Sequence, residues 1–156
     1  MKYRLRIRDE ESKKEINVSE DEIMEVKYKI GLAEDTNLAN SRSTVEMEIT
    51  GKIISNLENA GNNLNSENKS VNDDLYERNK KNIIDLVEWA ESYLQKSDYR
   101  NLEMLVDLGS NKKMDLKFTN MFVYNFLQEM SIEKGIGIFK LKLRQKFHQK
   151  NKLDIK

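Results

Sequence analysis

Alternation of apolar and polar residues dominates the two ends of the chain. Residues 2–8 read KYRLRIR, and residues 138–147 read IFKLKLRQKF. In both runs apolar side chains occupy every second position, and basic side chains fill most of the positions between them. This two-residue period is typical of β-strands that have one buried face and one solvated face. Each run is therefore predicted to be a strand with a basic outer face.

The same period recurs in residues 15–31, EINVSEDEIMEVKYKIG. Its β-branched and aromatic residues at two-residue spacing predict two strands. Ser19 and Glu22 also have the spacing of a helix-capping box, which leaves a helix start open as an alternative. We interpret the acidic run from Asp9 to Glu25 as a solvated edge, because it lacks the spacing and the glycine of a calcium-binding loop.

Residues 43–53, STVEMEITGKI, predict a further strand whose outer face is acidic. Glu46 and Glu48 alternate there with apolar residues. Residues 32–43 carry no sustained period and many turn-forming side chains, so we expect an extended loop before this strand. A basic strand beside the acidic one would form cross-strand pairs that each contribute a few tenths of a kcal/mol to about 1 kcal/mol. Such pairing is the purely structural explanation of the basic strands.

A change of composition precedes one predicted helix. Residues 56–72 are rich in asparagine and poor in apolar residues, so we expect a polar insert or linker there. Residues 73–96 then show a helical period, and a polar side chain at 72–74 is expected to cap the helix. Trp89 borders the apolar stripe and is interpreted as a packing residue. The stripe comprises Tyr76, Ile83, Leu86, Val87, Ala90 and Leu94.

Strands are predicted again after the helix. Residues 102–108 and 114–118 alternate and are joined by the turn sequence GSNKK, which indicates a β-hairpin. Residues 121–130, MFVYNFLQEM, are apolar at most positions and fit either a buried helix or a strand covered on both faces. Their aromatic content and the neighbouring strands favour the strand. Gly135 and Gly137 are expected to permit a bend or bulge where the last strand begins.

Together these elements predict a mainly β fold, an antiparallel β-barrel or sandwich with one packed α-helix. Strands and helices do not alternate along the chain, which argues against a parallel doubly wound sheet. We expect residues 1–156 to form a single domain, with the polar insert at about 56–72 and a polar tail at 148–156. Seven methionines, among them Met47, Met104 and Met121, are expected to fill gaps in the core.

Charge and composition narrow the possible functions. The 27 basic residues balance 27 acidic residues, whereas a dedicated nucleic-acid-binding domain is usually strongly basic. The chain contains no cysteine, which excludes disulfides and thiolate metal sites and favours an intracellular, cytoplasmic protein. No stretch approaches the roughly 18 apolar residues of a membrane span. We therefore expect no membrane contact.

The sequence offers no catalytic constellation. His148 is the only histidine, so a histidine-based triad or a multi-histidine metal site would depend on it alone. The GIG sequence at residues 135–137 lacks the lysine and the helix of a phosphate-binding loop. We expect no cofactor and no metal, and a binding or assembly protein rather than an enzyme.

The order of the predicted elements is informative as a whole. The segments that carry it are KYRLRIRDEES, RSTVEMEITGKI, DLVEWAESYL, LEMLVDLGSNKKMDLKFTNMFVYNF and IFKLKLRQKF. In this order the chain from residue 2 to residue 147 resembles the Hcp and phage tail-tube proteins. The resemblance implies a β-barrel subunit that closes into a ring, usually a hexamer. The rings stack into the inner tube of a contractile injection or type VI secretion system.

Partners follow from the same resemblance. Sheath and tip proteins of the same machine would surround the tube, the subunit would be secreted or ejected with it, and residues 32–43 would contact neighbouring rings. The chain departs from typical members in its six glycines and in the insert at 56–72. Balanced basic and acidic faces suit head-to-tail contacts between copies. The candidate assembly or lumen surface comprises Arg4, Arg6, Glu46, Glu48, Lys140, Lys142 and Arg144.

The alternative function is a barrel that binds nucleic acid or another anionic ligand through its basic strands. Base stacking would require aromatic side chains on the basic face. Alternation instead sends Phe139 and Phe147 to the side opposite Lys140 and Lys146. Nucleic acid is therefore the less favoured partner.

Overall fold

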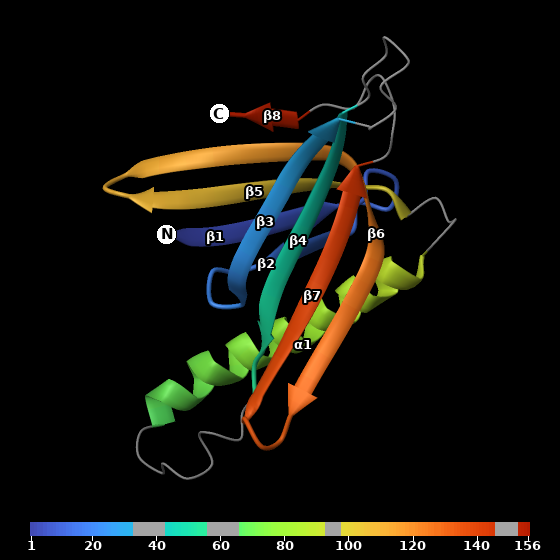
Figure 1. Cartoon of the computed structure of the whole chain (residues 1–156). Helices are drawn as coiled ribbons and strands as arrows, with labels where there is room; N and C mark the ends of the chain where they lie inside the picture. The colour runs from blue at the N-terminus through green and yellow to red at the C-terminus, as the bar shows by residue number, and fades with distance from the viewer. Residues whose placement is uncertain (33–42, 56–65, 93–97, 146–152) are drawn as a thin grey trace.

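The structure is a computed structural model that describes residues 1–32, 43–55, 66–92, 98–145 and 153–156. Within these residues the chain forms eight strands and one helix, shown in Figure 1. In chain order they are β1 (Lys2–Arg8), β2 (Glu15–Val18), β3 (Ile23–Leu32), β4 (Ser43–Ile53), α1 (Ser66–Glu91), β5 (Arg100–Gly109), β6 (Lys112–Ser131), β7 (Ile136–Gln145) and β8 (Leu153–Ile155).

All strand pairs are antiparallel, and the sheet runs in the order β2-β1-β5-β6-β7-β4-β3, with β8 on β6. The long strand β6 joins two halves of the sheet, because its first part pairs with β5 and its second part pairs with β7. Figure 1 shows the halves crossing, with β1, β2 and β5 in one layer and β3, β4 and β7 in the other. This arrangement confirms the predicted antiparallel barrel or sandwich with one helix.

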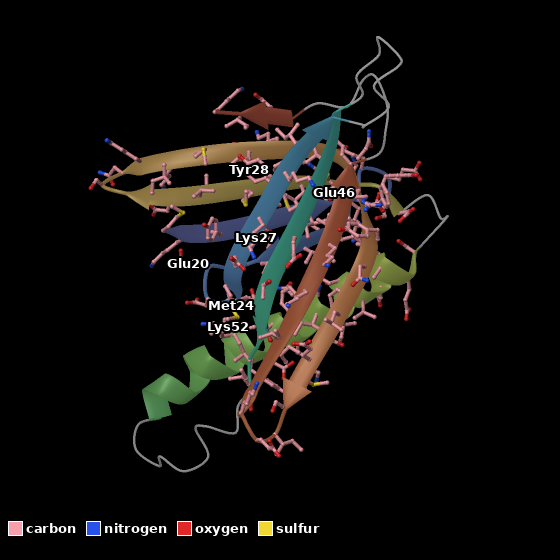
Figure 2. The ribbon with its side chains drawn as sticks, viewed as in Figure 1. Glu20, Met24, Lys27, Tyr28, Glu46 and Lys52 are labelled. Carbon is pink, nitrogen blue, oxygen red and sulfur yellow. The ribbon has the colours of Figure 1, made fainter. Side chains whose placement is uncertain are left out.

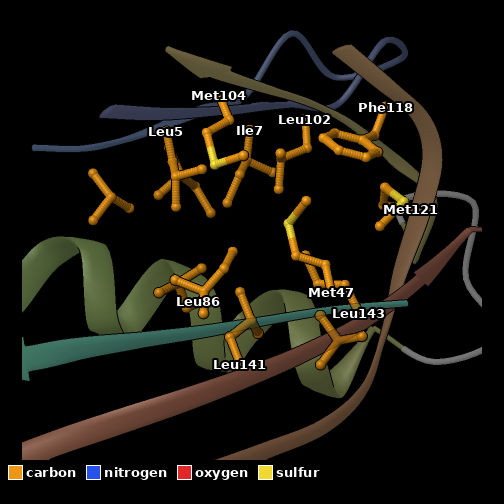
Figure 3. Close-up of a cluster of buried hydrophobic side chains, with 14 of the residues drawn as sticks. Leu5, Ile7, Met47, Leu86, Leu102, Met104, Phe118, Met121, Leu141 and Leu143 are labelled. Atoms are coloured by element: carbon orange, nitrogen blue, oxygen red, sulfur yellow. The ribbon is translucent and has the colours of Figure 1, made fainter. Parts of the chain in front are cut away.

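The core lies between the two layers and is built from the alternating apolar positions of the strands (Figure 3). Inward-facing residues of β1, β4 and β7 are buried, among them Leu5, Val45 and Leu141, whereas Tyr3 of β1 is only partly buried. Met47, Met104 and Met121 fill the core as expected. Burying a large apolar side chain contributes about 1.5–3 kcal/mol. Buried side chains from both layers include Leu5, Ile7, Met47, Leu102, Met104, Phe118, Leu141 and Leu143.

The β5–β6 hairpin is also confirmed. Ser110 and Asn111, at the centre of the turn, have φ angles of 53° and 61°. Positive φ at both central residues is typical of the tight turn that matches the twist of a two-stranded ribbon. Gly135, with φ of 62°, likewise forms part of the turn before β7.

Helix α1 packs against β2, β4 and β6 through an apolar face. Ile83, Leu86 and Trp89 are buried there, and the Trp89 indole N–H donates to the carbonyl of Asp98 at 2.8 Å. The predicted packing role of Trp89 is thus confirmed. The predicted start at residue 73 is wrong, because the helix begins at Ser66.

Residues 66–72 are therefore helical rather than part of an insert or a capping turn. Intrinsic helix propensities of residues other than glycine and proline differ by at most about 0.7 kcal/mol, so low apolar content does not end a helix. The helix ends at Glu91, and the Ser92 hydroxyl donates to the Trp89 carbonyl at 2.6 Å. Residues 56–65 and 93–97, including Leu94, lie outside the described residues.

Two further predictions are corrected. The second half of β6 is not covered on both faces, since Met121 and Val123 are buried but Tyr124, Leu127 and Met130 are exposed. Among the described strands, only β7 pairs with β6 from Phe122 onward, so no described strand occupies the other edge of this part of β6.

The predicted polar tail ends in the short strand β8, which pairs with residues 116–118 of β6. The rest of that tail and the loop expected at 32–43 fall almost entirely outside the described residues. The described part of the chain contains no helix long and apolar enough to cross a membrane.

Candidate assembly surfaces

Strand β4 carries a row of carboxylates that face the basic side chains of β7. Glu46 is opposite Arg144, and Glu48 is opposite Lys142 in the strand register. Arg144 Nε lies 3.1 Å from Glu46 Oε1, and Lys142 Nζ lies 3.8 Å from Glu48 Oε2. Lys140, the third basic residue, is opposite Thr50. The predicted pairing of a basic strand with the acidic strand is therefore present within a single chain.

Strand β3 places a second basic row on the other side of β4. Lys27 is opposite Glu48, and Lys29 is opposite Glu46 in the strand register. Lys27 Nζ lies 3.3 Å from Glu25 Oε2 of its own strand. Carboxylates thus lie between two rows of cations. Such exposed pairs are worth about 0–1 kcal/mol each, so they set register and partner choice more than stability.

The arginines of β1 belong to a different surface. Arg6 Nε lies 3.2 Å from Glu15 Oε1, and its Nη1 lies 3.5 Å from Glu103 Oε2. Arg4 Nη2 lies 3.8 Å from Glu20 Oε2. Strands β5 and β6 separate β1 from β7 in the sheet. The structure therefore divides the seven candidate residues into two groups, with Arg4 and Arg6 apart from the group on β4 and β7.

An aromatic side chain lies on the basic face, contrary to the expectation from alternation. Phe139 is buried in the core as predicted, and Phe147 lies outside the described residues. The Arg144 guanidinium, however, lies 4.2 Å from the centre of the Tyr124 ring. Tyr124 belongs to β6 and sits where the β6–β7 register shifts. The alternation along β7 could not predict this contact, because the ring comes from the neighbouring strand β6 at a β-bulge.

Two open strand edges flank the half-sheet β6-β7-β4-β3. Strand β3 pairs with β4 on one side, and no other described strand pairs with it. At the opposite end of the half-sheet, the pairing of β6 with β5 stops at Met121, and β7 is the one described strand that pairs with residues 122–131 of β6. Both edges are about ten residues long. Unpaired edges of this length are templates for pairing with another chain.

Exposed apolar side chains lie at these same edges. On β3, Tyr28 and Ile30 are opposite the core residues Met47 and Val45, yet Ile30 is 53% exposed. Figure 2 shows Tyr28 along β3 at the border of the half-sheet. On β6, Met130 is 74% exposed. The apolar side of the half-sheet thus continues to both edges, and exposed apolar patches of this kind mark interaction sites.

A buried carboxylate that sequence reasoning misassigned holds α1 to the sheet. Glu22 is almost completely buried. Its carboxylate accepts a hydrogen bond from the Ser19 N–H at 2.8 Å. It also accepts hydrogen bonds from the side-chain amides of Asn79 and Asn82, at 3.0 and 3.1 Å. Asn79 also accepts from the Ile54 N–H at 2.8 Å. The interpretation of this segment as a solvated edge is wrong at Glu22. The capping-box spacing of Ser19 and Glu22 was the signal in the sequence that could have revealed this role. In the structure these two residues close the turn between β2 and β3 and do not start a helix.

A second buried acid, Asp9, lies at the end of β1. Burial works to raise its pKa, but hydrogen bonds from Ser12 and Glu11 and the charge of Arg100 outweigh burial, so the pKa lies below the ordinary value. The Arg100 guanidinium lies 5.4 Å from the centre of the Trp89 ring. Burial lowers the pKa of Arg100, and Asp9 opposes that change. The solvated-edge interpretation is therefore also wrong at Asp9.

The described residues contain no group of three or more histidine, aspartate or glutamate side chains that could hold a metal ion. The features that remain are surfaces: two open edges, a charged face and exposed apolar side chains.

Comparison with solved structures identifies the fold. The Hcp1 protein from E. coli is similar at a TM-score of 0.59 and 10% identity, over 100% of this chain and 98% of that chain. Hcp1 from Flavobacterium johnsoniae is similar at a TM-score of 0.50 and 11% identity, over 98% of this chain and 94% of that chain. A chain of the anti-feeding prophage baseplate, 6-fold symmetrised, is similar at a TM-score of 0.51 and 5% identity, over 99% of this chain and 92% of that chain. No protein-family model and no curated protein matches the sequence. The chain has the Hcp and tail-tube fold that its element order predicted.

Proposed function

We propose that this chain is a structural subunit that closes into a ring, and that the rings stack into the inner tube of a contractile injection or type VI secretion-like system. The observation that carries the proposal is the pair of open edges at opposite ends of the half-sheet β6-β7-β4-β3. The fold, shared with Hcp proteins and a baseplate chain, supports the same role.

The strand directions suit a ring seam. Each of the three pairings between β6 and β3 is antiparallel, so β6 runs opposite to β3 within one copy. Rotation about an axis along the strands brings β6 of the next copy beside β3 in antiparallel orientation. The contact is heterologous, joining one edge to a different edge, and such contacts close into rings when the rotation fits. Backbone hydrogen bonds across the seam would satisfy both edges.

The side chains suit the same seam. Joining the edges would cover Tyr28 and Ile30 of one copy and Met130 of the next, which are exposed in a single chain. Complete burial of such a side chain contributes up to about 1.5–3 kcal/mol. The seam therefore explains why apolar residues are exposed at both ends of the half-sheet.

Six copies per ring is the size we propose. Each copy would contribute four strands spaced about 4.8 Å apart, so six copies form a wall roughly 115 Å around. The six-fold symmetry named for the baseplate neighbour supports this number. Sheath and tip proteins are the proposed partners, the role is structural and not catalytic, and the subunit would leave the cell with the machine.

Nucleic-acid binding is the second candidate, and the Arg144–Tyr124 contact is the observation that favours it. Two features weigh against it. Arg144 already covers the Tyr124 ring, and Glu46 and Glu48 lie between the cationic rows, where they would repel phosphates.

Cross-linking tests the seam directly, because the chain has no natural cysteine. Lys27→Cys on β3 and Asn125→Cys on β6 lie three strand spacings apart in one copy, or about 14 Å. A thiol-reactive linker shorter than this distance would join only different copies. We expect covalent multimers of up to six chains, while either single-cysteine variant gives none beyond a dimer.

Two surface substitutions complete the test. Ile30→Asp with Met130→Asp should abolish rings seen by light scattering, whereas Leu108→Asp, at a residue of similar exposure (47%) away from the seam, should not. Wild-type protein that stays monomeric at high concentration and low salt, and gives no cross-linked multimers, would contradict the proposal.

A further inference from the structure

Strand β8 lies near the open edge of β3, in the opposite layer of the fold. β8 pairs with residues 116–118 of β6, and Leu153 is opposite Phe118 there. The Tyr28 ring of β3 lies edge-on to the Phe118 ring, at a centroid distance of 5.7 Å. Phe118 therefore links the two strands, and Figure 1 shows β8 and the end of β3 at the same end of the molecule.

Ile155 of β8 is an apolar residue that the single chain leaves half uncovered. It is opposite Leu116, a completely buried core residue, and directly opposite residues of an antiparallel pair share one face of the sheet. Ile155 therefore lies on the core side of its layer. It is nevertheless 47% exposed, and Met114, the next core-side residue of β6, is only partly buried.

The other layer ends in the same way. Tyr28 and Ile30 of β3 lie on the core side, opposite the core residues Met47 and Val45, and both are exposed. The core thus has an open margin, formed on one side by Tyr28 and Ile30 and on the other by Met114 and Ile155. Exposed apolar residues from two layers at one margin indicate a site that a partner covers.

The proposed seam brings a second copy to this open margin. With β6 of the next copy beside β3, the core-side residues of that strand continue the layer formed by β3. Gln128 and Met130 lie on that side, because Gln128 is opposite the buried Phe139 and Met130 is two residues further along. Both are exposed in the single chain. Stacked sheets lie about 10 Å apart, so β8 is the described strand that faces them across the margin.

We propose that β8 of one copy packs over the seam, with Ile155 against the core side of β6 of the next copy. This inference rests on the proposed ring, and it assigns β8 a part in closing the ring. Each contact between copies would then involve both layers, with strand pairing at β3 and side-chain packing at β8. Two sheets packed face to face with interdigitating side chains form the core of β-sandwiches. The contact is heterologous, as a closed ring requires.

Dilution of the rings tests the contribution of β8. Ile155→Asp should raise the protein concentration at which half of the rings dissociate at least tenfold, as measured by mass photometry. Gln128→Asp, on the other side of the contact, should do the same. The matched control is Leu108→Asp, because Leu108 has the same 47% exposure but lies two strands from β8 and about 15 Å from Ile155. Its rings should dissociate within about twofold of the wild-type concentration.

A second measurement separates assembly from folding. Ile155→Asp is also introduced into the Ile30→Asp and Met130→Asp variant, in which rings are not expected. The free energy of unfolding in urea should be unchanged there, because Ile155 is half exposed in the single chain. A clear fall in that free energy would assign Ile155 to the fold of the single chain and overturn the proposal.

Cross-linking identifies the partner of β8. The variant carries Ile155→Cys and Gln128→Cys. Within one copy Gln128 lies twelve residues past Leu116, the partner of Ile155, which is about 40 Å along a strand that crosses from one layer to the other. The short linker chosen for the seam therefore joins these two cysteines only between copies. We expect multimers beyond a dimer, whereas either single-cysteine variant should stop at a dimer.

The outcomes distinguish the β8 contact from the ring itself. Ile155→Asp rings that dissociate at the wild-type concentration, or rings in which the cysteines at 155 and 128 do not cross-link, would overturn the role of β8 and leave the ring standing. Cross-links between these cysteines without closed rings would refute the ring and leave the β8 contact standing. Neither rings nor these cross-links would refute both.

Discussion

The ring of Phe139 occupies the space beside Gly51 that any larger residue would need. The two residues are opposite each other in the β4–β7 pair, and a Cβ at Gly51 would lie 2.2 Å from Phe139 Cζ. The Phe139 ring also stacks with Phe126 at a centroid distance of 6.2 Å. An aromatic ring over a glycine on the neighbouring strand pins the register of a sheet. The same register aligns Glu46 and Glu48 with the cations of β7.

Gly51→Ala should therefore lower the free energy of unfolding by about 1–3 kcal/mol, because the added methyl forces the ring to move in a packed core. Urea denaturation measures the change. Phe139→Leu removes the clash, so the double variant should be more stable than the sum of the two single losses predicts. Strict additivity would show that the two residues do not compete for the same space.

The contact between Asn79 and Glu22 should be worth more than any exposed pair. Asn79→Ala leaves the buried carboxylate and the Ile54 N–H short of a partner, at a cost of about 1–3 kcal/mol. The matched control is Lys80→Ala, the neighbouring exposed residue of α1, which should change stability by less than about 0.5 kcal/mol. Equal losses in the two variants, measured by urea denaturation, would contradict the role of the Asn79–Glu22 contact in holding α1 to the sheet.

Asp9 should make stability depend on pH. Its pKa is lower in the folded protein than the ordinary value, so it stabilises the fold above the unfolded-state pKa of about 3.9. This contribution is lost as the pH falls through the folded pKa. The stability difference between wild type and Asp9→Asn should thus stay constant above about pH 5 and shrink below pH 4. A stability difference that grows as the pH falls would contradict a lowered pKa of Asp9 in the folded protein.

Binding to DNA should be weak and unspecific. With Glu46 and Glu48 among the basic rows, we expect dissociation constants no tighter than the roughly 10⁻⁶ M of nonspecific binding at physiological salt. Fluorescence anisotropy with a labelled duplex and a single strand measures this. Tight binding with a steep salt dependence, lost in the Lys140→Glu and Arg144→Glu double variant, would favour the alternative function.

The period of the strands made most of the fold predictable. Alternation placed Leu5 and Ile7 in β1 and Leu141 and Leu143 in β7 on the buried side, because a two-residue period has only one face to bury. The β5–β6 hairpin was predictable because its turn needs residues that tolerate positive φ. These are local properties of the chain.

Properties that depend on neighbours were not predictable. The start of α1 at Ser66 has no apolar signal, and the burial of Glu22 depends on two asparagines 57 and 60 residues away. Tyr124 reaches Arg144 from another strand at a bulge. The open edges of β3 and β6 were also hidden, because which strand has no partner is decided only when the sheet forms.

Negative-stain electron microscopy of the purified wild-type protein tests the central claim most directly. At high concentration and low salt we predict closed rings with six-fold symmetry, each with about six times the 18.4 kDa mass of the monomer when the same sample is measured by light scattering. The Ile30→Asp and Met130→Asp double variant should show no rings under the same conditions. Monomeric wild-type particles, or rings that survive the double variant unchanged, would contradict the account.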